Sequence, residues 1–326
     1  VQLKQFSLFL NTFGKRLGVK LGKIAASSTA AMSVSSSKNP CLEHEIGQIL
    51  RFRPEKTAEP LWVFDYASAF KPFFHPLRTP KGHVVTIDEP HDHVWHHGLW
   101  FTLKYVNGVN FWEEPPASGG PFGRQIVSHP PLVEHRENGQ IALSMALDWI
   151  NPNGEKPLEE RRNVTFSPRD SLSYTLDFSF ELRALRDLEL ERTPYGKFGN
   201  FGGYAGFTVR CNRNWQKTRL LFSDGQTNER PLGIGANWAD LSGIFDGGSE
   251  QWGGIALFNH LENPRQSSPW YGKSGENHYL NAAFLFHKPM TLSAGETLHL
   301  RYRALVHDEI FEVEALDAVY REFCDA

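Results

Sequence analysis

Cysteine and long apolar stretches are scarce in this chain, and their scarcity excludes several classes of protein. The three cysteines, Cys41, Cys211 and Cys324, are far apart and form no Cys-x-x-Cys pair. Neither a disulfide framework nor a zinc ribbon is therefore indicated. No run of about 18 apolar residues occurs in the sequence, which excludes an ordinary membrane-spanning helix.

The sequence also lacks an excess of either charge and lacks the common cofactor motifs. Its 34 Lys and Arg residues are balanced by 37 Asp and Glu residues, so nothing indicates nucleic acid or an anionic membrane as a partner. No Gly-x-x-x-x-Gly-Lys-Ser/Thr, Gly-x-Gly-x-x-Gly, Gly-x-Ser-x-Gly or His-Glu-x-x-His motif is present. Nucleotide cofactors, serine hydrolysis and zincin chemistry thus have no support.

Acidic residues are absent before Glu43, where basic residues and a Ser/Ala-rich stretch over 25–37 stand instead. We expect residues 1–40 to be a tail outside the folded domain, and two interpretations of it stay open. It is a disordered or targeting-like segment, or Met32 is the true start and the residues before it are not translated. The second interpretation implies a soluble cytoplasmic protein, whereas a targeting-like segment would allow export.

Apolar and polar residues alternate along 141–149, 172–182 and 298–306. A period of two is typical of antiparallel strands that have one face in the core and one in water. Turn signals such as Asn-Gly and Asp-Gly separate these segments, so we predict an all-β domain over 41–326, a large antiparallel β-sandwich. Shorter strands are expected at 62–66, 84–87, 99–105, 207–211, 254–258 and 283–286.

One helix is predicted, over 308–324 at the C-terminal end. Apolar residues such as Val313, Leu316 and Val319 recur there at three- and four-residue steps. Asp308 and Glu309 would occupy the first turn, where the helix dipole favours acids. We expect this helix to pack on the sandwich.

Histidine is concentrated in residues 91–97, which hold four of the chain's 14 histidines. Imidazole titrates near neutral pH, donates and accepts hydrogen bonds, and is a common metal ligand. The segment has no strand or helix periodicity, so we predict a loop, and loops on a rigid sheet often carry sites. In an extended loop His91, His93 and Trp95 would share one side, and His96 would lie on the other.

These histidines leave three interpretations open. His93 and His96 could act as acid and base together with Glu113, whose pKa would rise if it were buried against the preceding aromatic residues. An His-x-His pair could instead give two metal ligands, with His91, His93 and His96 holding a divalent metal. Alternatively, the rings only bond backbone carbonyls within the protein.

Polar residues elsewhere suggest a binding site. Arg78 and Arg210 are isolated among apolar residues, where a guanidinium holds a carboxylate or a substrate oxygen, or forms a buried ion pair. Two predicted loops, 235–240 and 258–271, mix amides, acids, an imidazole and Trp. Such groups offer flat faces for the C–H side of a sugar and donors and acceptors for its hydroxyls, although turn chemistry alone also explains Asn and Pro there.

Over about residues 50–308 the sequence resembles a bacterial domain family labelled "methane oxygenase PmoA". The motifs that carry this resemblance are Phe74-His75-Pro76-Leu77-Arg78-Thr79-Pro80, Asp92-His93-x-Trp95-His96-His97-Gly98-Leu99-Trp100, Asn107-Gly108-x-x-Phe111-Trp112, Arg210, Asn237-Trp238-x-Asp240, and His260-x-x-Asn263-Pro264 with Pro269-Trp270. More distantly, the His-His-Gly-Leu-Trp and Gly-Val-Asn-Phe-Trp pattern is similar to the histidine-glycine box of galactose mutarotase and other aldose epimerases. Those are antiparallel β-supersandwiches that use a His acid and a carboxylate base on a sugar.

The second resemblance implies a mutarotase-like β-supersandwich that acts on a sugar or oligosaccharide in an open cleft, with no cofactor. His93 and His96 would do the acid/base work, and Glu113 would be the carboxylate. The residues expected to hold the substrate are Arg78, His97, Trp100, Arg210, Asn237, Trp238, His260, Asn263 and Trp270. The alternatives are a non-catalytic carbohydrate-binding module and a metal-dependent lyase, hydrolase or oxygenase.

Overall fold

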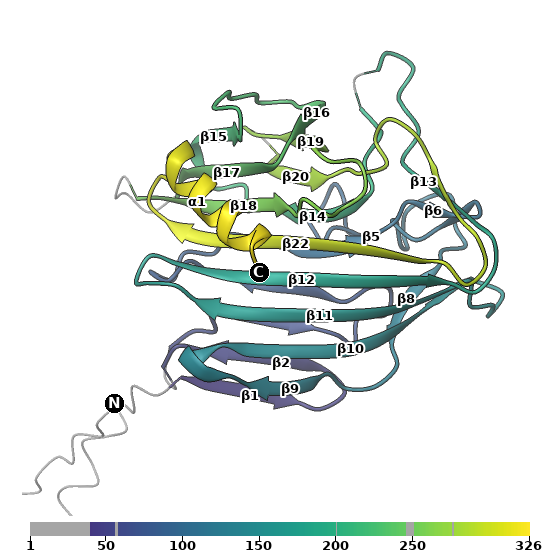
Figure 1. Ribbon diagram of the computed structural model, residues 1–326, viewed down its shortest axis with the longest axis horizontal. Coiled ribbons are helices and arrows are strands. Elements are labelled where there is room, and N and C mark those ends of the chain that lie inside the picture. Colours follow the sequence, from purple (N-terminus) through teal and green to yellow (C-terminus); the bar gives the residue numbers. More distant parts are fainter. Residues whose placement is uncertain (1–39, 56–57, 200, 246–250, 276) are drawn as a thin grey trace, which may run out of the picture. The chain divides into compact units, whose positions relative to one another are not determined.

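The structure, a computed structural model, describes residues 40–55, 58–199, 201–245, 251–275 and 277–326 (Figure 1). Of the predicted tail, residues 1–40, only residue 40 lies within the described part of the chain. Within the described chain the strands form two nine-stranded sheets and a four-stranded sheet, and every strand pair that they contain is antiparallel.

The first sheet has the order β1 (Cys41–Glu45), β2 (Ile49–Arg53), β3 (Trp62–Asp65), β4 (Phe73–Leu77), β5 (Leu99–Thr102), β14 (Gly206–Arg210), β20 (Tyr279–Ala282), β19 (Ser268–Lys273), β16 (Leu232–Ala236). The second has the order β15 (Gln216–Phe222), β17 (Trp238–Ile244), β18 (Trp252–Asn259), β22 (Thr297–Asp308), β12 (Ser173–Ala184), β11 (Leu158–Pro168), β10 (Ile141–Ile150), β8 (Arg124–Val127), with β9 (Leu132–His135) also beside β10. The small sheet contains β21 (Met290–Leu292), β13 (Leu188–Glu191), β6 (Tyr105–Val106) and β7 (Val109–Asn110).

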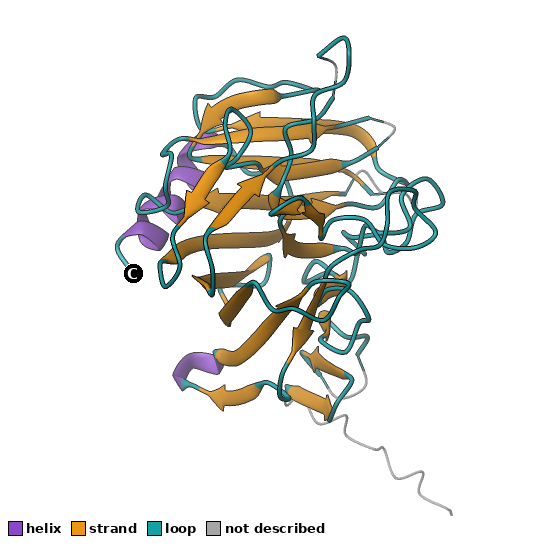
Figure 2. Ribbon diagram, turned by 90° about the vertical axis from the view of Figure 1, so that its right-hand side faces the viewer, coloured by secondary structure: helices purple, strands orange, loops and turns teal. Residues whose placement is uncertain are grey.

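The hydrophobic core lies between the two large sheets. Phe101 on β5 stacks on Phe180 of β12, with ring centroids 4.3 Å apart, and Phe207 on β14 stacks on Tyr302 of β22 at 5.0 Å. All four rings are buried. The predicted all-β sandwich is thus confirmed, and Figure 2 shows the strand layers from the side.

The three long alternating segments are confirmed as β10, β12 and β22. Two shorter predictions are wrong. Residues 84–87 form only isolated bridges, from Val84 to Arg78 and from Thr86 to Cys211. Residues 283–286 form a turn that is closed by the bond from the Phe286 amide to the Ala283 carbonyl.

The predicted helix is present but begins later than expected. Helix α1 spans Val313–Cys324, and Asp308 is still the last residue of β22, paired with Gly253. The acids at 308 and 309 therefore do not lie in a helical turn, because sheet hydrogen bonds hold the backbone there: the Asp308 amide donates to Leu172 and the Glu309 amide to Trp252.

Helix α1 packs on the outer face of the second sheet (Figure 1). Its buried residues Leu316, Val319 and Phe323 contact Trp238 and Phe258. In the described part of the chain no helix has the length and apolar character needed to cross a membrane.

Candidate functional site

The outer face of the first sheet carries a row of large polar and aromatic side chains. Successive residues of a strand face opposite sides, so the core residues Phe207 and Val209 of β14 leave Arg210 on the outer face. Arg210 is paired with Tyr279 of β20, and Tyr279 is paired in turn with Lys273 of β19. Neighbouring strands are about 4.8 Å apart, so Arg210 and Lys273 start about 10 Å apart with Tyr279 between them.

A second row lies beside the first. Trp100 on β5 is paired with Thr208, Thr208 with Asn281, and Asn281 with Tyr271 of β19. The Asn281 amide donates to the Thr208 hydroxyl at 2.7 Å and to the Phe207 carbonyl at 3.1 Å, which fixes the middle of the row. The two rows form an aromatic face flanked by cations.

The loop of residues 91–97, the histidine loop, covers one end of this face. It is not extended as predicted but contains two consecutive turns, in which the His93 amide donates to Pro90 and the His96 amide to His93. Residues three apart therefore meet, and the rings of His93 and His96 stack with centroids 4.7 Å apart. His91 is exposed, and its Nδ1 lies 3.4 Å from an Arg213 nitrogen.

Gly98 joins this loop to the sheet. Its φ is +53°, and a Cβ at this position would lie 2.2 Å from the Phe74 carbonyl oxygen. The Gly98 amide donates to Ile87 at 3.0 Å, and its carbonyl accepts from the Arg210 amide at 2.7 Å. Only glycine fits this close approach, which places the histidines next to the guanidinium of Arg210.

A cavity of about 220 Å³ lies on this face, and we call it the histidine cavity. Its described lining includes no Asp or Glu. Its lining residues are His93, His96, Phe201, Tyr204, Arg210, Arg230, Tyr271, Lys273, Asn277 and Tyr279. The rings of Tyr204, Tyr271 and Tyr279 are mutual neighbours, with centroids 4.9–6.2 Å apart.

His96 is the buried polar centre of the cavity wall. Its ring stacks on Tyr279 at 5.4 Å and lies 5.2 Å from the Trp100 ring, and its Nδ1 has no hydrogen-bond partner among the described protein atoms. Burial, followed by the positive charges of His93 and Arg210, holds the pKa of His96 well below its usual value. The imidazole is therefore neutral at neutral pH and can accept a proton.

Asp92 connects the loop to two arginines. Its Oδ2 lies 3.0 Å from His93 Nδ1 and 3.3 Å from Arg210 Nη2, and its Oδ1 accepts from Arg213. Burial would raise the pKa of Asp92, but the adjacent His93 and the charges of the arginines outweigh it and lower that pKa. Arg210 also donates to Asn277 Oδ1 at 2.9 Å, so its head group is held from two sides.

A second polar network lies next to Phe73, the β4 partner of Trp100. His97 stacks on Phe73 at 4.7 Å, and its Nδ1 and Nε2 lie 2.7 Å from Asp88 Oδ1 and 2.8 Å from Glu114 Oε1. Buried Lys71 donates to the same Glu114 oxygen and to the Trp112 carbonyl. Burial would lower the pKa of His97, but its bonds to the two carboxylates raise it above its usual value.

Of the two adjacent glutamates, Glu114 thus bonds His97, whereas Glu113, the predicted carboxylate, pairs with Lys104. Burial would raise the pKa of Glu114, but the bond with His97 and the charge of Lys71 lower it. Neither Glu lines the histidine cavity.

The structure brings some predicted site residues together and separates others. His93, His96 and Arg210 line the histidine cavity, and Trp100 contacts His96 behind it. Arg78 lies just after β4, 3.6 Å from Glu59, outside the cavity lining. His97 lies in the buried network described above.

The remaining candidates contact other protein groups. Trp238 donates to Asp317 of α1 at 2.8 Å, and the buried His260 accepts from the Glu262 amide. Asn263 bonds both backbone groups of Arg301. Asn237 accepts from Gln266, and Trp270 is in the core, where it donates to Ala236.

Sequence reasoning missed Tyr271, Lys273 and Tyr279. Residues 258–271 were predicted as a loop, yet β19 alternates the core residue Trp270 with the outward Tyr271, and Gly272 with the outward Lys273. That alternation is the signal that could have identified Tyr271 and Lys273, and Tyr279 precedes the core residue Leu280 in the same way on β20.

The metal alternative has no preformed ligand set in the described chain. No three His, Cys, Asp or Glu side chains gather closely enough there to hold an ion. His91, the third member of the proposed trio, is exposed beside Arg213, whereas His93 and His96 stack on one another.

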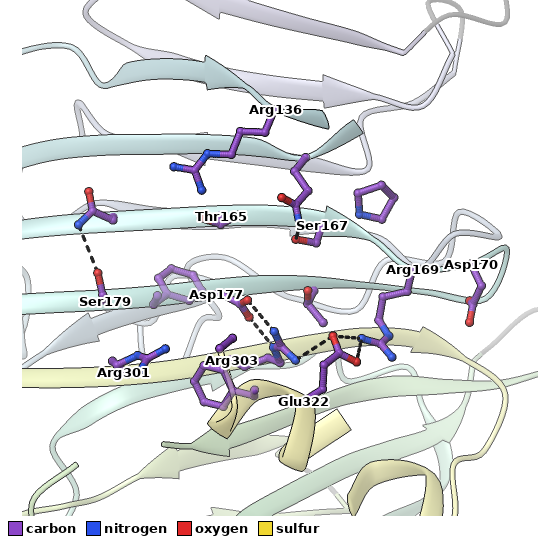
Figure 3. A pocket seen from close by; sticks show the side chains of 17 residues that line it. Arg136, Thr165, Ser167, Arg169, Asp170, Asp177, Ser179, Arg301, Arg303 and Glu322 are labelled. Carbon is purple, nitrogen blue, oxygen red and sulfur yellow. Dashed lines mark hydrogen bonds and ion pairs between the residues drawn. The ribbon is translucent and has the colours of Figure 1, made fainter. Parts of the chain in front are cut away.

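A larger cavity of about 680 Å³, the outer cavity, lies on the far face of the second sheet beside α1 (Figure 3). Its arginines already face carboxylates: Arg303 bonds Asp177 at 2.6 and 2.7 Å, and Arg169 bonds Glu322 at 2.8 Å (Figure 3). The histidine cavity combines stacked rings with less compensated charge, so it is the better candidate site.

Comparisons with known proteins give a family match and several distant structural matches. Residues 55–321 match a family model described as "Family of unknown function (DUF6807)". No curated protein matches. A structure described as "Putative kojibiose phosphorylase from human microbiome" is 10% identical, with a TM-score of 0.32, over 89% of this chain and 36% of that one. A TPR-domain containing protein from Parabacteroides distasonis is 10% identical, with a TM-score of 0.24, over 85% and 54%.

The chain spans about a third of the length of the first structure and about half of the second. At these scores neither structure assigns a fold or an activity to this chain. The matched family description carries no activity either.

Proposed function

The chain belongs to the DUF6807 family, whose function is not established, and from this premise we propose that it binds a carbohydrate in the histidine cavity and acts on it with His93 and His96. The observation that carries the proposal is the combination of neighbouring tyrosine rings with a neutral buried imidazole and fixed polar groups in one small cavity.

The cavity lining suits a sugar ring. The faces of Tyr271 and Tyr279 are flat apolar surfaces for the C–H side of a pyranose, and Arg210 and Asn277 supply donors and an acceptor for hydroxyls. Pockets for drug-sized ligands occupy roughly 300–1,000 Å³. At about 220 Å³ this cavity matches a single ring rather than a long oligosaccharide.

The two histidines differ in the way that acid/base chemistry requires. His96 is buried and neutral, so it can take the proton of the anomeric hydroxyl. His93 is more exposed and is oriented by Asp92, so in its protonated form it can give a proton to the ring oxygen. The C1–O5 bond then breaks, the C1 hydroxyl becomes the aldehyde carbonyl, and reclosure from either face exchanges the anomers.

A non-catalytic sugar-binding module is the second candidate, because one observation favours it. No described carboxylate lines the cavity, since Glu113 is held by Lys104 and Glu114 by Lys71 and His97. A site that pairs a histidine acid with a carboxylate base therefore has no such base among the described lining residues.

The test combines binding and turnover. Titration calorimetry with a panel of monosaccharides measures binding, and NMR exchange between the anomer signals measures turnover. We expect Tyr271→Ala to abolish binding, whereas the partly exposed Tyr320→Ala on α1 leaves it unchanged. His96→Gln should retain binding and lose turnover.

The results of this test distinguish an enzyme from a binding module. Binding with no turnover in the unaltered protein supports the module and overturns the enzyme. Absence of binding for every sugar, or binding that survives Tyr271→Ala, overturns the proposal as a whole.

A further inference from the structure

The charged side chains in the described lining of the histidine cavity are basic. Arg210, Arg230 and Lys273 line it, and its described lining has no acid. The tyrosines add no negative charge, because burial raises the pKa of Tyr204 to about 12 and also raises the pKa of Tyr271. A small cavity with excess positive charge attracts anions.

Two of these cations lack an ion-pair partner in the part of the chain that the structure describes: neither Arg230 nor Lys273 lies within 4.0 Å of a carboxylate there. Arg210 does have one, but it shares Asp92 with Arg213, so one carboxylate serves two guanidinium groups. The Nε of Arg210 is buried and has no hydrogen-bond partner among the described groups. The outer cavity differs, because its Arg303 and Arg169 are matched by Asp177 and Glu322.

The three positive charges lie at the ends of the aromatic face. Arg210 and Lys273 flank Tyr279 in one cross-strand row, and the exposed Arg230 lies beside Tyr271 at the rim. A ring that stacks on the tyrosines would thus direct a substituent toward a cation. Guanidinium and ammonium groups bind carboxylates and phosphates through charge-assisted hydrogen bonds.

We propose that the histidine cavity selects an anionic sugar, whose carboxylate or phosphate group lies among Arg210, Arg230 and Lys273. This inference rests on the proposed function, since it names the class of sugar for the same cavity. The carboxylate of a uronic acid and the phosphate of a sugar phosphate share the chemistry that these cations recognise.

The experiment compares neutral sugars with their anionic derivatives. Calorimetry measures the affinity for glucose against glucuronate and glucose 6-phosphate, and for galactose against galacturonate. We expect an anionic member to bind at least about tenfold more tightly than its neutral counterpart, because a hydrogen bond to a charged group contributes about 1.5–3 kcal/mol. The advantage should shrink as the salt concentration rises.

Two surface variants locate the anion. Arg230→Gln and Lys273→Gln should each weaken binding of the anionic sugar about five- to tenfold and change binding of the neutral sugar less than about twofold. Arg136→Gln, which removes a charge in the outer cavity, is the matched control and should change neither. Preference for uronate over phosphate, or the reverse, identifies the charged group.

The inference and the proposed function fail in different ways. Equal or tighter binding of neutral sugars that is still lost in Tyr271→Ala overturns the anionic class and keeps the sugar site. An anionic preference that survives both Gln variants also overturns the inference. No binding of any sugar overturns the proposed function itself.

Discussion

His97 and Glu114 are joined by a bond of 2.8 Å between His97 Nε2 and Glu114 Oε1, next to Phe73, on which the His97 ring stacks. Lys71 shares the same carboxylate oxygen, and all three side chains are nearly or fully buried. A buried cation that loses its partner is left without the solvation that water would give. The position of His97 therefore depends on this buried charge balance.

Removal of the Glu114 charge should destabilise the fold strongly. Glu114→Gln leaves Lys71 buried without its carboxylate, and we expect the free energy of unfolding to fall by about 3–5 kcal/mol. Urea denaturation followed by tryptophan fluorescence measures this. The exposed pair of Glu134 and Arg136 is the control, since Glu134→Gln should cost less than about 1 kcal/mol. Similar losses in both variants would contradict the buried balance.

The contribution of His97 to stability should depend on pH. Its folded-state pKa is raised above the unfolded value, so the contribution is complete below about pH 6.5 and is lost as the pH rises through the folded-state pKa. The difference in unfolding free energy between the unaltered protein and His97→Gln should therefore shrink from pH 6 toward pH 9. His96, whose pKa is held well below its usual value, is neutral in the folded form of both proteins over this pH range, so it does not cause the change. A difference that grows with pH would show that His97 is held neutral.

Substitution of Gly98 should disrupt the histidine loop. Gly98→Ala adds a Cβ that would lie 2.2 Å from the Phe74 carbonyl oxygen at a φ of +53°, and we expect a loss of roughly 2–5 kcal/mol. Gly47→Ala is the control, because its φ is also positive at +83° but nothing lies within 4 Å, so about 1–2 kcal/mol should be lost. Thermal unfolding measures both, and equal costs would mean that the close approach to β4 is not rigid.

The contact of α1 with the second sheet should contribute measurably to stability. Leu316 is fully buried against the sheet, and Leu316→Ala should cost roughly 2–5 kcal/mol. Leu261, which is 50% exposed, is the control, and Leu261→Ala should change stability by less than about 0.5 kcal/mol. Urea denaturation measures both losses, and equal losses would contradict close packing of α1 on the sheet.

The long strands could be predicted because their burial repeats every second residue, as in β12, where Leu176 and Phe178 are buried and the side chain of Asp177 between them is partly exposed. The same rule identified Arg210 as an isolated charge in an apolar strand. Prediction failed where a tight turn, rather than a strand, sets the direction of a side chain. The Asn110 side chain accepts from the Trp112 and Glu113 amides, and this turn directs Glu114 rather than Glu113 toward His97.

The rest of the site depends on which strands pair and on how the loops turn. Tyr271 and Tyr279 are close because β19 and β20 are neighbours in the first sheet, and nothing in either segment alone specifies that pairing. His93 and His96 meet because of two local turns, which the spacing of the histidines allows but does not require.

On β19 the consecutive residues Trp270 and Tyr271 belong to different environments, one sealed between the sheets and one on the cavity wall. Mutations at every second position of this strand can therefore exchange the surface that meets a ligand while the interior stays intact. Ligand preference can diverge among related chains without a change of scaffold, and an engineer could vary positions 271 and 273 together as an independent library.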